Sequence, residues 1–296
     1  MGGATSKDVL EDPDTGTRYI AKLGGRNSDL EVMTEYAIYL IGMSLGVDVA
    51  GARIALYRGR LRFLSRYFLN RARAEELVHG IQLFRELYDE HTVLAVQGRV
   101  DREQALFNVQ AVQGTFGAHY LHYGPHVEVD LFRGFVTMLT HDAIIGVQDR
   151  HHENWGVIVE RGRESAPPRF APLYDSARGL FCNSVDEHLQ KFFDSDGDER
   201  LRRYVAGSRP LVGFGGLAPV GRAHLTHDEL LAVLYREYPE YRQMIRGLIS
   251  RFDARRIDTL LRQLSPLCSP RRRHLIVACL QKRRDTLLAA IDAAEN

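Results

Sequence analysis

Polar and apolar positions in the first third of the chain follow two different periods. Residues 8–25 form two β-prone runs on either side of the turn-rich segment Asp12–Gly16, which predicts an antiparallel hairpin. Ser28 and Glu31 then have the spacing of a capping box, and apolar residues follow at intervals of three and four. This pattern predicts a helix that ends at Gly46.

The period changes again along the rest of the chain. Residues 49–69 resume strand character, with two runs around Arg58-Gly-Arg60. Helical spacing dominates from about residue 74, and a hairpin-like pair of apolar runs interrupts it. The helical segments are 75–90, 101–121, 130–146 and most of the chain after 222, and the paired runs are 154–160 and 169–181. The predicted fold is α+β with two lobes: a small β-rich lobe with one helix, residues 1–70, and a larger, mainly helical lobe, residues 71–296.

Composition excludes several classes of protein. The 296 residues include 39 basic and 38 acidic side chains, a net charge of +1, so there is no strong signal for binding nucleic acid or an anionic membrane. The three cysteines lack metal-ligand spacing, which argues against a disulfide framework or a structural zinc site. No apolar run has the length of a membrane span, and the start lacks an apolar signal region. We expect a cytoplasmic protein, with export as an effector left open.

One polar segment, D-R-H-H-E-N, lies directly before an apolar run. Its Asp149 and Asn154 are five residues apart, the interval between the catalytic Asp and the metal-binding Asn of protein-kinase catalytic loops. Asp175 ends a second apolar run, F-A-P-L-Y-D. Because Mg²⁺ prefers oxygen ligands, Asn154 and Asp175 are candidate ligands. Asp149 would then accept the proton of an attacking hydroxyl.

The chain uses arginine as its ordinary cation, so a lysine inside a strand is unusual. Only four of the 39 basic residues are lysines, and Lys22 is the one that lies in an apolar strand segment. Glu35 on the following helix is its candidate partner, since such an ion pair holds the ammonium near the α- and β-phosphates of ATP. Glu31, one turn earlier, is the rival partner, but its capping role favours Glu35.

Four segments together characterise a known family. They are K-L-G-G (22–25), T-E-Y-A-I-Y-L-I-G-M-S-L-G-V (34–47), D-R-H-H-E-N (149–154) and A-P-L-Y-D (171–175). Together they resemble HipA-like serine/threonine kinases, which are known from bacterial toxin–antitoxin systems and from stand-alone relatives. The resemblance extends to about residue 180 and implies a protein-kinase-like fold.

The resemblance also implies a role for each matching position. In chain order these roles are phosphate binding for Lys22, pairing with that lysine for Glu35, the catalytic base for Asp149, support of the catalytic loop for His151, and magnesium binding for Asn154 and Asp175. The segment Gly2–Lys7 resembles the family's phosphate-covering loop, with Gly3 and Ser6 near the nucleotide. Some members are autophosphorylated on serine there, and Thr5 and Ser6 are the matching hydroxyls.

The expected function is therefore an ATP- and Mg²⁺-dependent protein kinase acting on serine or threonine. A protein substrate and a regulatory partner, either an antitoxin or a host factor, follow from the same resemblance. The D-R-H-x-x-N core also occurs in phosphoinositide kinases, which makes a lipid kinase one alternative, although Tyr-Asp-Ser at 174–176 favours the HipA-like side. A non-catalytic pseudokinase or binding module is the other alternative.

Three further motifs have simpler explanations. The adjacent His151 and His152, with His141 nearby, are poorly arranged for one tetrahedral zinc ion. Residues 194–199 (D-S-D-G-D-E) lack the glycine position of a calcium loop, which predicts a solvated acidic turn. The cluster at 271–273 predicts an exposed helix start.

Overall fold

The small lobe contains a four-stranded antiparallel sheet. The computed structural model describes residues 7–23, 28–88, 107–163, 165–176, 178–215 and 225–295. The strands are β1 (Lys7–Glu11), β2 (Arg18–Leu23), β3 (Ala52–Tyr57) and β4 (Arg60–Arg66), in the order β1-β2-β4-β3. The predicted hairpin and the predicted β-rich segment at 49–69 are therefore confirmed. At the tip of the β3–β4 hairpin, Arg58 and Gly59 both have positive φ, as a two-residue turn matched to strand twist requires.

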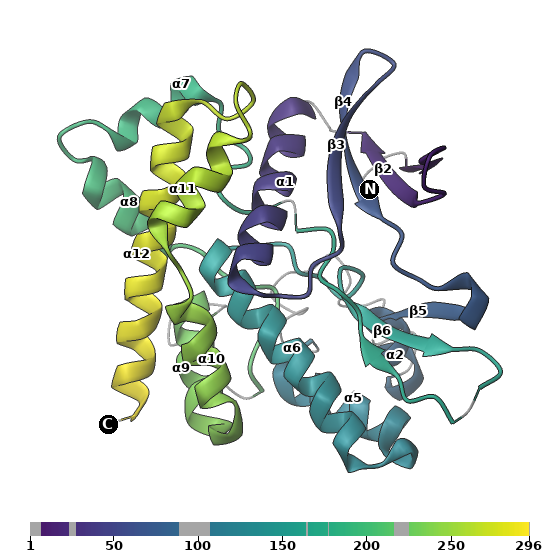
Figure 1. Ribbon diagram of the computed structural model, residues 1–296. Helices are drawn as coiled ribbons and strands as arrows, with labels where there is room; N and C mark the ends of the chain where they lie inside the picture. Colours follow the sequence, from purple (N-terminus) through teal and green to yellow (C-terminus); the bar gives the residue numbers. More distant parts are fainter. Residues whose placement is uncertain are drawn as a thin grey trace.

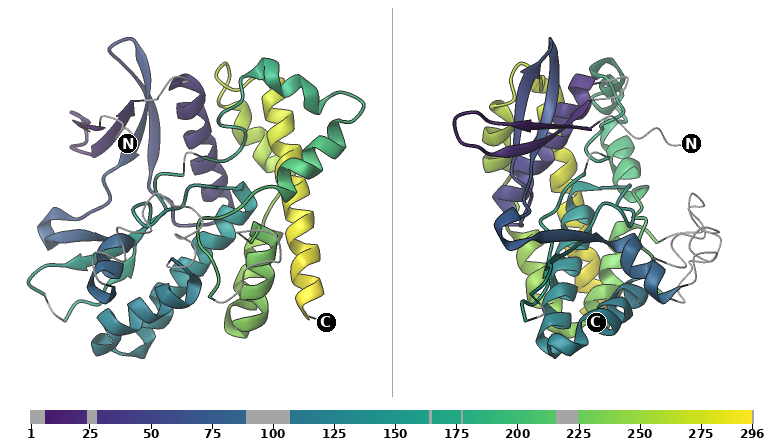
Figure 2. Two further views of the ribbon diagram at one scale, coloured as in Figure 1. Left: turned by 180° about the vertical axis from the view of Figure 1, so that it is seen from behind. Right: turned by 90° about the vertical axis from the view of Figure 1, so that its right-hand side faces the viewer.

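Helix α1 (Ser28–Leu45) lies between this sheet and the rest of the molecule, as Figures 1 and 2 show from opposite sides. Gly46 ends the helix as predicted, with φ of 74°, a conformation that favours glycine. The apolar face of α1 belongs to the large core beyond the sheet; its members are Met33, Ala37, Ile38, Ile41 and Leu45.

Hydrogen bonds to backbone groups also join the end of α1 to the large lobe. The carbonyl of Leu45 accepts a hydrogen bond of 3.0 Å from Nη1 of Arg251. Just after the helix, the N–H of Ala50 donates to the carbonyl of Leu173 and the N–H of Leu173 donates to the carbonyl of Asp48, each at 2.8 Å. The helix is thus tied to the segment that leads to Asp175.

The large lobe is mainly helical and includes one small sheet. Its α-helices are α2 (Gly80–Leu87), α5 (Val109–Tyr120), α6 (Pro125–Ile145), α7 (Asp186–Leu189), α8 (Gly197–Ala206), α9 (His227–Glu237), α10 (Arg242–Ser250), α11 (Ala254–Arg262) and α12 (Pro270–Glu295). Short 3₁₀ helices are η1 (Arg71–Arg73), η2 (Leu121–Tyr123), η3 (Gln190–Phe192) and η4 (Pro239–Tyr241). The antiparallel sheet is formed by β5 (Glu75–His79), β6 (Gly156–Glu160) and β7 (Arg169–Phe170). The small sheet-bearing lobe and the mostly helical remainder confirm the predicted α+β fold.

Several local predictions need correction. Residues 75–79 were predicted to be helical, but they form β5, because pairing with β6 outweighs the apparent helical spacing. The second strand of the predicted pair at 169–181 is only two residues long. Residues 197–199 of the predicted acidic turn begin α8. Arg272 in the predicted exposed cluster is buried, because it pairs with Asp186.

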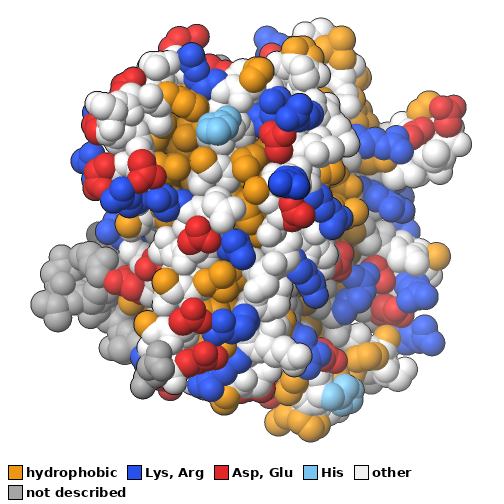
Figure 3. All heavy atoms as spheres, turned by 60° about the vertical axis from the view of Figure 1, so that its left-hand side comes forward, with side chains coloured by type: hydrophobic (Ala, Val, Ile, Leu, Met, Phe, Trp, Pro, Cys, Tyr) orange, Lys and Arg blue, Asp and Glu red, His pale blue; other side chains and the backbone are white. Residues whose placement is uncertain are grey.

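The surface agrees with a net charge near zero. Acidic and basic side chains are interspersed over the face shown in Figure 3. No helix among the described residues combines the length and the apolar character needed to cross a membrane.

Candidate active site

Lys22 connects the two lobes through its ammonium group. It lies on β2 opposite Phe63 of β4. Its Nζ is 2.7 Å from Oε1 of Glu35 on α1 and 2.6 Å from Oδ1 of Asp175 in the large lobe. Burial alone would lower the pKa of Lys22, but the two carboxylates raise it above its ordinary value. The lysine is therefore a fixed positive charge at this point.

Asp175 reaches Lys22 from an irregular segment. Leu173 forms an isolated parallel bridge with Val49, and the chain then leaves the regular backbone conformation. Asp175 has φ of 53°, a left-handed conformation that Asp tolerates better than most residues and that the surrounding contacts must maintain. This turn directs its carboxylate to the junction between the lobes.

The segment that carries Asp149 forms a compact loop between α6 and β6. Nδ2 of Asn154 and the N–H of His151 both donate to the carbonyl of Asp149, at 3.0 and 2.9 Å. The N–H of Asn154 donates to the carbonyl of His151 at 2.9 Å. Nδ1 of His151 accepts from the N–H of Glu153 at 3.3 Å. These bonds fix the positions of Asp149 and Asn154 relative to each other.

The two oxygens of the Asp149 carboxylate have different environments. Oδ2 lies 3.3 Å from Nε of Arg178, whereas Oδ1 is buried and has no hydrogen-bond partner. Burial raises the pKa of Asp149 above its ordinary value, and His151 and Arg178 oppose that shift. A group with these properties can accept a proton from a hydroxyl that enters the site.

A cavity of about 190 Å³ lies beside Lys22 and Asp175. Its lining combines the end of β4 and the following segment with β5 and the loop before Asp175. The lining residues are Ile20, Lys22, Ser65, Tyr67, Phe68, Leu69, Leu77, His79, Tyr174 and Asp175. The hydroxyl of Tyr174 donates to the carbonyl of Glu153 at 3.1 Å and shares a 3.0 Å hydrogen bond with Nδ1 of His79. A mostly apolar cavity with a few charged groups at one end is typical of a small-molecule site.

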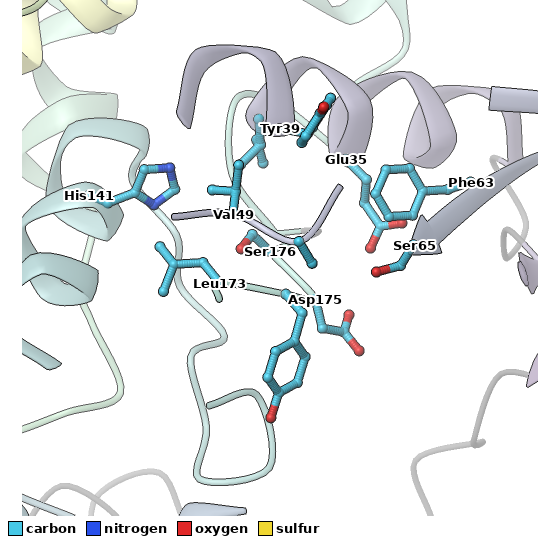
Figure 4. A pocket seen from close by; sticks show the side chains of 12 residues that line it. Glu35, Tyr39, Val49, Phe63, Ser65, His141, Leu173, Asp175 and Ser176 are labelled. Carbon is cyan, nitrogen blue, oxygen red and sulfur yellow. The ribbon is translucent and has the colours of Figure 1, made fainter. Parts of the chain in front are cut away.

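A smaller cavity of about 30 Å³ is lined in part by Glu35 and Asp175 (Figure 4). In Figure 4, Glu35 descends from α1 toward Ser65 and Asp175, while His141 closes the opposite side. The volume suits about one water molecule. The large cavity is therefore the one with room for a ligand.

Six of the eight residues singled out from the sequence are described, and they form two groups, one around Nζ of Lys22 and one in the loop between α6 and β6. They are Lys22, Glu35, Asp149, His151, Asn154 and Asp175. Of the two acidic residues considered as the partner of Lys22, Glu35 makes the 2.7 Å contact. Gly3 and Ser6, together with Thr5, lie outside the described residues.

The neighbouring histidines have separate environments. The rings of His151 and His152 are 5.8 Å apart, and His152 stacks on Phe107 at 4.4 Å. Burial lowers the pKa of His152 to about 4, so it is neutral at physiological pH. His152 is therefore a packing residue behind the loop.

Two residues of the site were not predicted from the sequence. Arg178 faces Asp149 from the segment after Asp175. Arg150 is buried and forms a two-pronged ion pair with Asp142 of α6, at 2.7 and 2.8 Å. A signal for this pair was present, since Asp142 is a carboxylate followed directly by the apolar run Ala143–Ile145 and Arg150 follows eight residues later.

The donor set fits a magnesium–nucleotide complex. Asp175 supplies a carboxylate, and Asn154 retains its side-chain oxygen because its Nδ2 is used by the carbonyl of Asp149. Hard oxygen ligands of this kind, completed by phosphates and water, suit Mg²⁺. Lys22 supplies the positive charge that phosphates need beside the cavity.

Comparisons with known proteins establish the class of fold. No protein-family model and no curated protein sequence matches this chain. Among solved structures, the chain has the kinase-like fold that the sequence resemblance implied.

Two solved structures illustrate this similarity. The proinflammatory kinase CtkA of Helicobacter pylori aligns with a TM-score of 0.75 and 17% identity, over 100% of this chain and 93% of CtkA. The second is HipA of Shewanella oneidensis, solved in the toxin–antitoxin complex with HipB and operator DNA. It aligns with a TM-score of 0.56 and 14% identity, over 99% of this chain and 66% of HipA.

Proposed function

We propose that this protein is an ATP- and Mg²⁺-dependent protein kinase that transfers the γ-phosphoryl group to serine or threonine hydroxyls. One observation carries the proposal: Nζ of Lys22 lies 2.7 Å from Oε1 of Glu35 and 2.6 Å from Oδ1 of the distant Asp175, and Lys22 and Asp175 line the 190 Å³ cavity. The kinase-like fold supports it.

Each side chain has a defined task in this reaction. The adenine occupies the cavity beside Tyr67–Leu69, and Lys22 contacts the α- and β-phosphates. Asn154 and Asp175 hold Mg²⁺, which when bound neutralises charge on the phosphate oxygens. Asp149 orients the acceptor hydroxyl and takes its proton.

The remaining expectations belong to the same proposal. Gly3 and Ser6 cover the phosphates, and Thr5 or Ser6 receives a phosphoryl group in autophosphorylation. Residues 1–70 and 71–296 act as the two lobes around the nucleotide. Since the Shewanella HipA structure contains HipB, a regulatory protein partner is proposed here as well. The three free cysteines favour a cytoplasmic location.

The direct test is the mass of the purified protein before and after incubation with ATP and Mg²⁺, together with transfer of labelled phosphate. We expect a gain of at least one phosphate, and labelling of a protein extract in preference to phosphoinositide vesicles. Preferential labelling of the vesicles would identify a lipid kinase. Absence of ATP turnover would leave a nucleotide-binding module without catalysis.

Replacement of Lys22 should abolish this reaction. We predict that Lys22→Met lowers transfer at least about 100-fold, because the phosphates lose the positive charge that positions them. The matched control is Lys191→Met, since Lys191 is exposed and packs on the ring of Phe192. Equal rates for Lys22→Met and wild type would contradict the proposed site.

A further inference from the structure

Arg150 is the most extensively bonded side chain of the catalytic loop. It is 2% exposed. A guanidinium group has five N–H donors in a rigid plane, and all five are used here. Because every donor has a partner, the surrounding acceptors are arranged to match this one side chain.

The partners of Arg150 come from three separate segments. Nε and Nη2 donate to the carboxylate of Asp142 on α6. Nη1 donates to the carbonyl of Asn154 at 2.9 Å and to the carbonyl of Tyr174 at 2.8 Å. Nη2 also donates to Oγ of Ser176 at 2.7 Å. Two of these partners, Tyr174 and Ser176, directly flank Asp175.

The two loops joined in this way carry the two candidate magnesium ligands. One hydrogen bond is made to Asn154 itself, and two more are made on either side of Asp175. The ion pair with the buried carboxylate of Asp142 on α6 fixes the orientation of the guanidinium plane. One side chain, whose five donors all bond to protein groups, thus connects the segments that carry the two ligands.

We infer that Arg150 is a positioning residue that sets the spacing of Asn154 and Asp175 and thereby the affinity of the site for a divalent cation. The inference rests on the proposed function and concerns the regulation of metal binding in that same site. Groups that orient metal ligands from outside commonly change metal affinity by about 10–100-fold when they are replaced.

Lysine cannot replace this residue. An ammonium group has three donors and no planar fork, so Arg150→Lys leaves at least two of the five acceptors without a partner. The charge and most of the volume remain. A loss caused by this variant therefore reports the geometry of the hydrogen bonds.

Arg272 on α12 provides a matched control. It is also 2% exposed, pairs with Asp186 at 2.7 Å, and donates to the carbonyls of Phe181 and Ser184. None of these partners is Asn154 or Asp175. Arg272→Lys therefore perturbs the same chemistry in a segment without a candidate metal ligand.

The experiment measures ATP affinity by calorimetry with and without Mg²⁺, and the unfolding midpoint by circular dichroism. We expect Mg²⁺ to strengthen ATP binding to wild type. Arg150→Lys should lose about tenfold or more of that gain while metal-free ATP affinity stays within about twofold. Arg272→Lys should lower the unfolding midpoint and keep the Mg²⁺ gain.

The outcomes separate the inference from the proposed function. The inference would be overturned if Mg²⁺ increased the ATP affinity of Arg150→Lys as much as that of wild type, or if both lysine variants lost the same part of this increase. The kinase proposal would still stand in either case. If Mg²⁺ did not change the ATP affinity of the wild-type protein, both the inference and the proposed kinase function would be overturned. If Arg150→Lys does not fold, Ser176→Ala removes one of the five bonds and should still lose about threefold of the gain; an undiminished gain there would refute the positioning role.

Discussion

Asp149 shows how the environment of a single carboxylate defines its chemistry. Burial raises its pKa, Arg178 contacts one oxygen, and the other oxygen has no partner. Because Oδ1 is also buried, an acceptor hydroxyl in the proposed reaction would reach it only after a local rearrangement exposes that oxygen. Asn154 bonds to the backbone carbonyl of Asp149 and not to its carboxylate.

Asp149→Asn should separate binding from transfer. The amide keeps the shape of the side chain but cannot accept the proton, so we predict a decrease in kcat of about 100- to 10,000-fold. ATP affinity and the unfolding midpoint should stay near wild type. Glu153→Gln is the control, because Glu153 is exposed in the same loop. Near-normal transfer by Asp149→Asn would remove Asp149 from the proposed mechanism.

At the residue scale, the sequence indicated candidate site residues whose type or spacing differs from the rest of the chain. Lys22 was recognisable because the chain otherwise uses arginine, and Asp149 and Asn154 because of their spacing. Three of the five bonds of Arg150 were not predictable, since two go to backbone carbonyls and one to a hydroxyl brought near by folding. Backbone acceptors leave no trace in a sequence pattern.

Among the elements, α6 packs very closely against β7. A Cβ at Gly134 of α6 would lie 2.5 Å from the Cβ of Phe170. A methyl group at this position cannot be accommodated unless the helix or the strand moves. The glycine therefore sets the distance between α6, which leads into the loop that carries Asp149, and the strand that leads to Asp175.

Gly134→Ala should destabilise the protein by about 1–3 kcal/mol, because the added methyl overpacks the contact with Phe170. Gly114→Ala on α5 is the matched control. A Cβ there meets nothing within 4 Å, so helix propensity should stabilise that variant by about 0.5–1 kcal/mol. Urea unfolding checks both values, and effects of the same sign would contradict this account of the packing.

Element types were predictable where periodicity was long, as in α1 and the middle of α6. The strand β5 was missed because five residues with two apolar positions fit either period, and only pairing with β6 decides between them. The segment after β7 was predicted to continue as a strand. It is irregular, and Asp175 within it adopts a left-handed conformation while Lys22 bonds to its carboxylate and Arg150 bonds to the carbonyl of Tyr174.

For the molecule as a whole, the buried pair of Asp142 and Arg150 links stability to pH. Burial alone would raise the pKa of Asp142, but the guanidinium of Arg150 more than offsets that effect and holds the pKa at about 2. Because the folded-state pKa lies below the ordinary value, the ionised carboxylate stabilises the folded state above about pH 4. That contribution is lost as the pH falls from about 4 toward 2.

Asp142→Asn should therefore be less stable than wild type by roughly 2 kcal/mol at pH 6, and the difference should shrink below pH 4. At low pH the wild-type carboxyl is also neutral, so the two proteins become alike at this position. Urea unfolding at pH 6, 4 and 3 measures the trend. A difference that is constant across this range would show that the charge of Asp142 contributes nothing to folding.

The hydrogen bonds that anchor helix α1 affect how the two lobes can move relative to each other. Glu35 on α1 and Asp175 beyond Leu173 are attached to one framework through the bonds at Leu45 and Ala50. Lys22 alone is carried by the sheet. Separating Lys22 from these two carboxylates would require the sheet to shift relative to both, and the packing of Val32 on α1 against Ala52 and Phe63 of the sheet opposes such a shift.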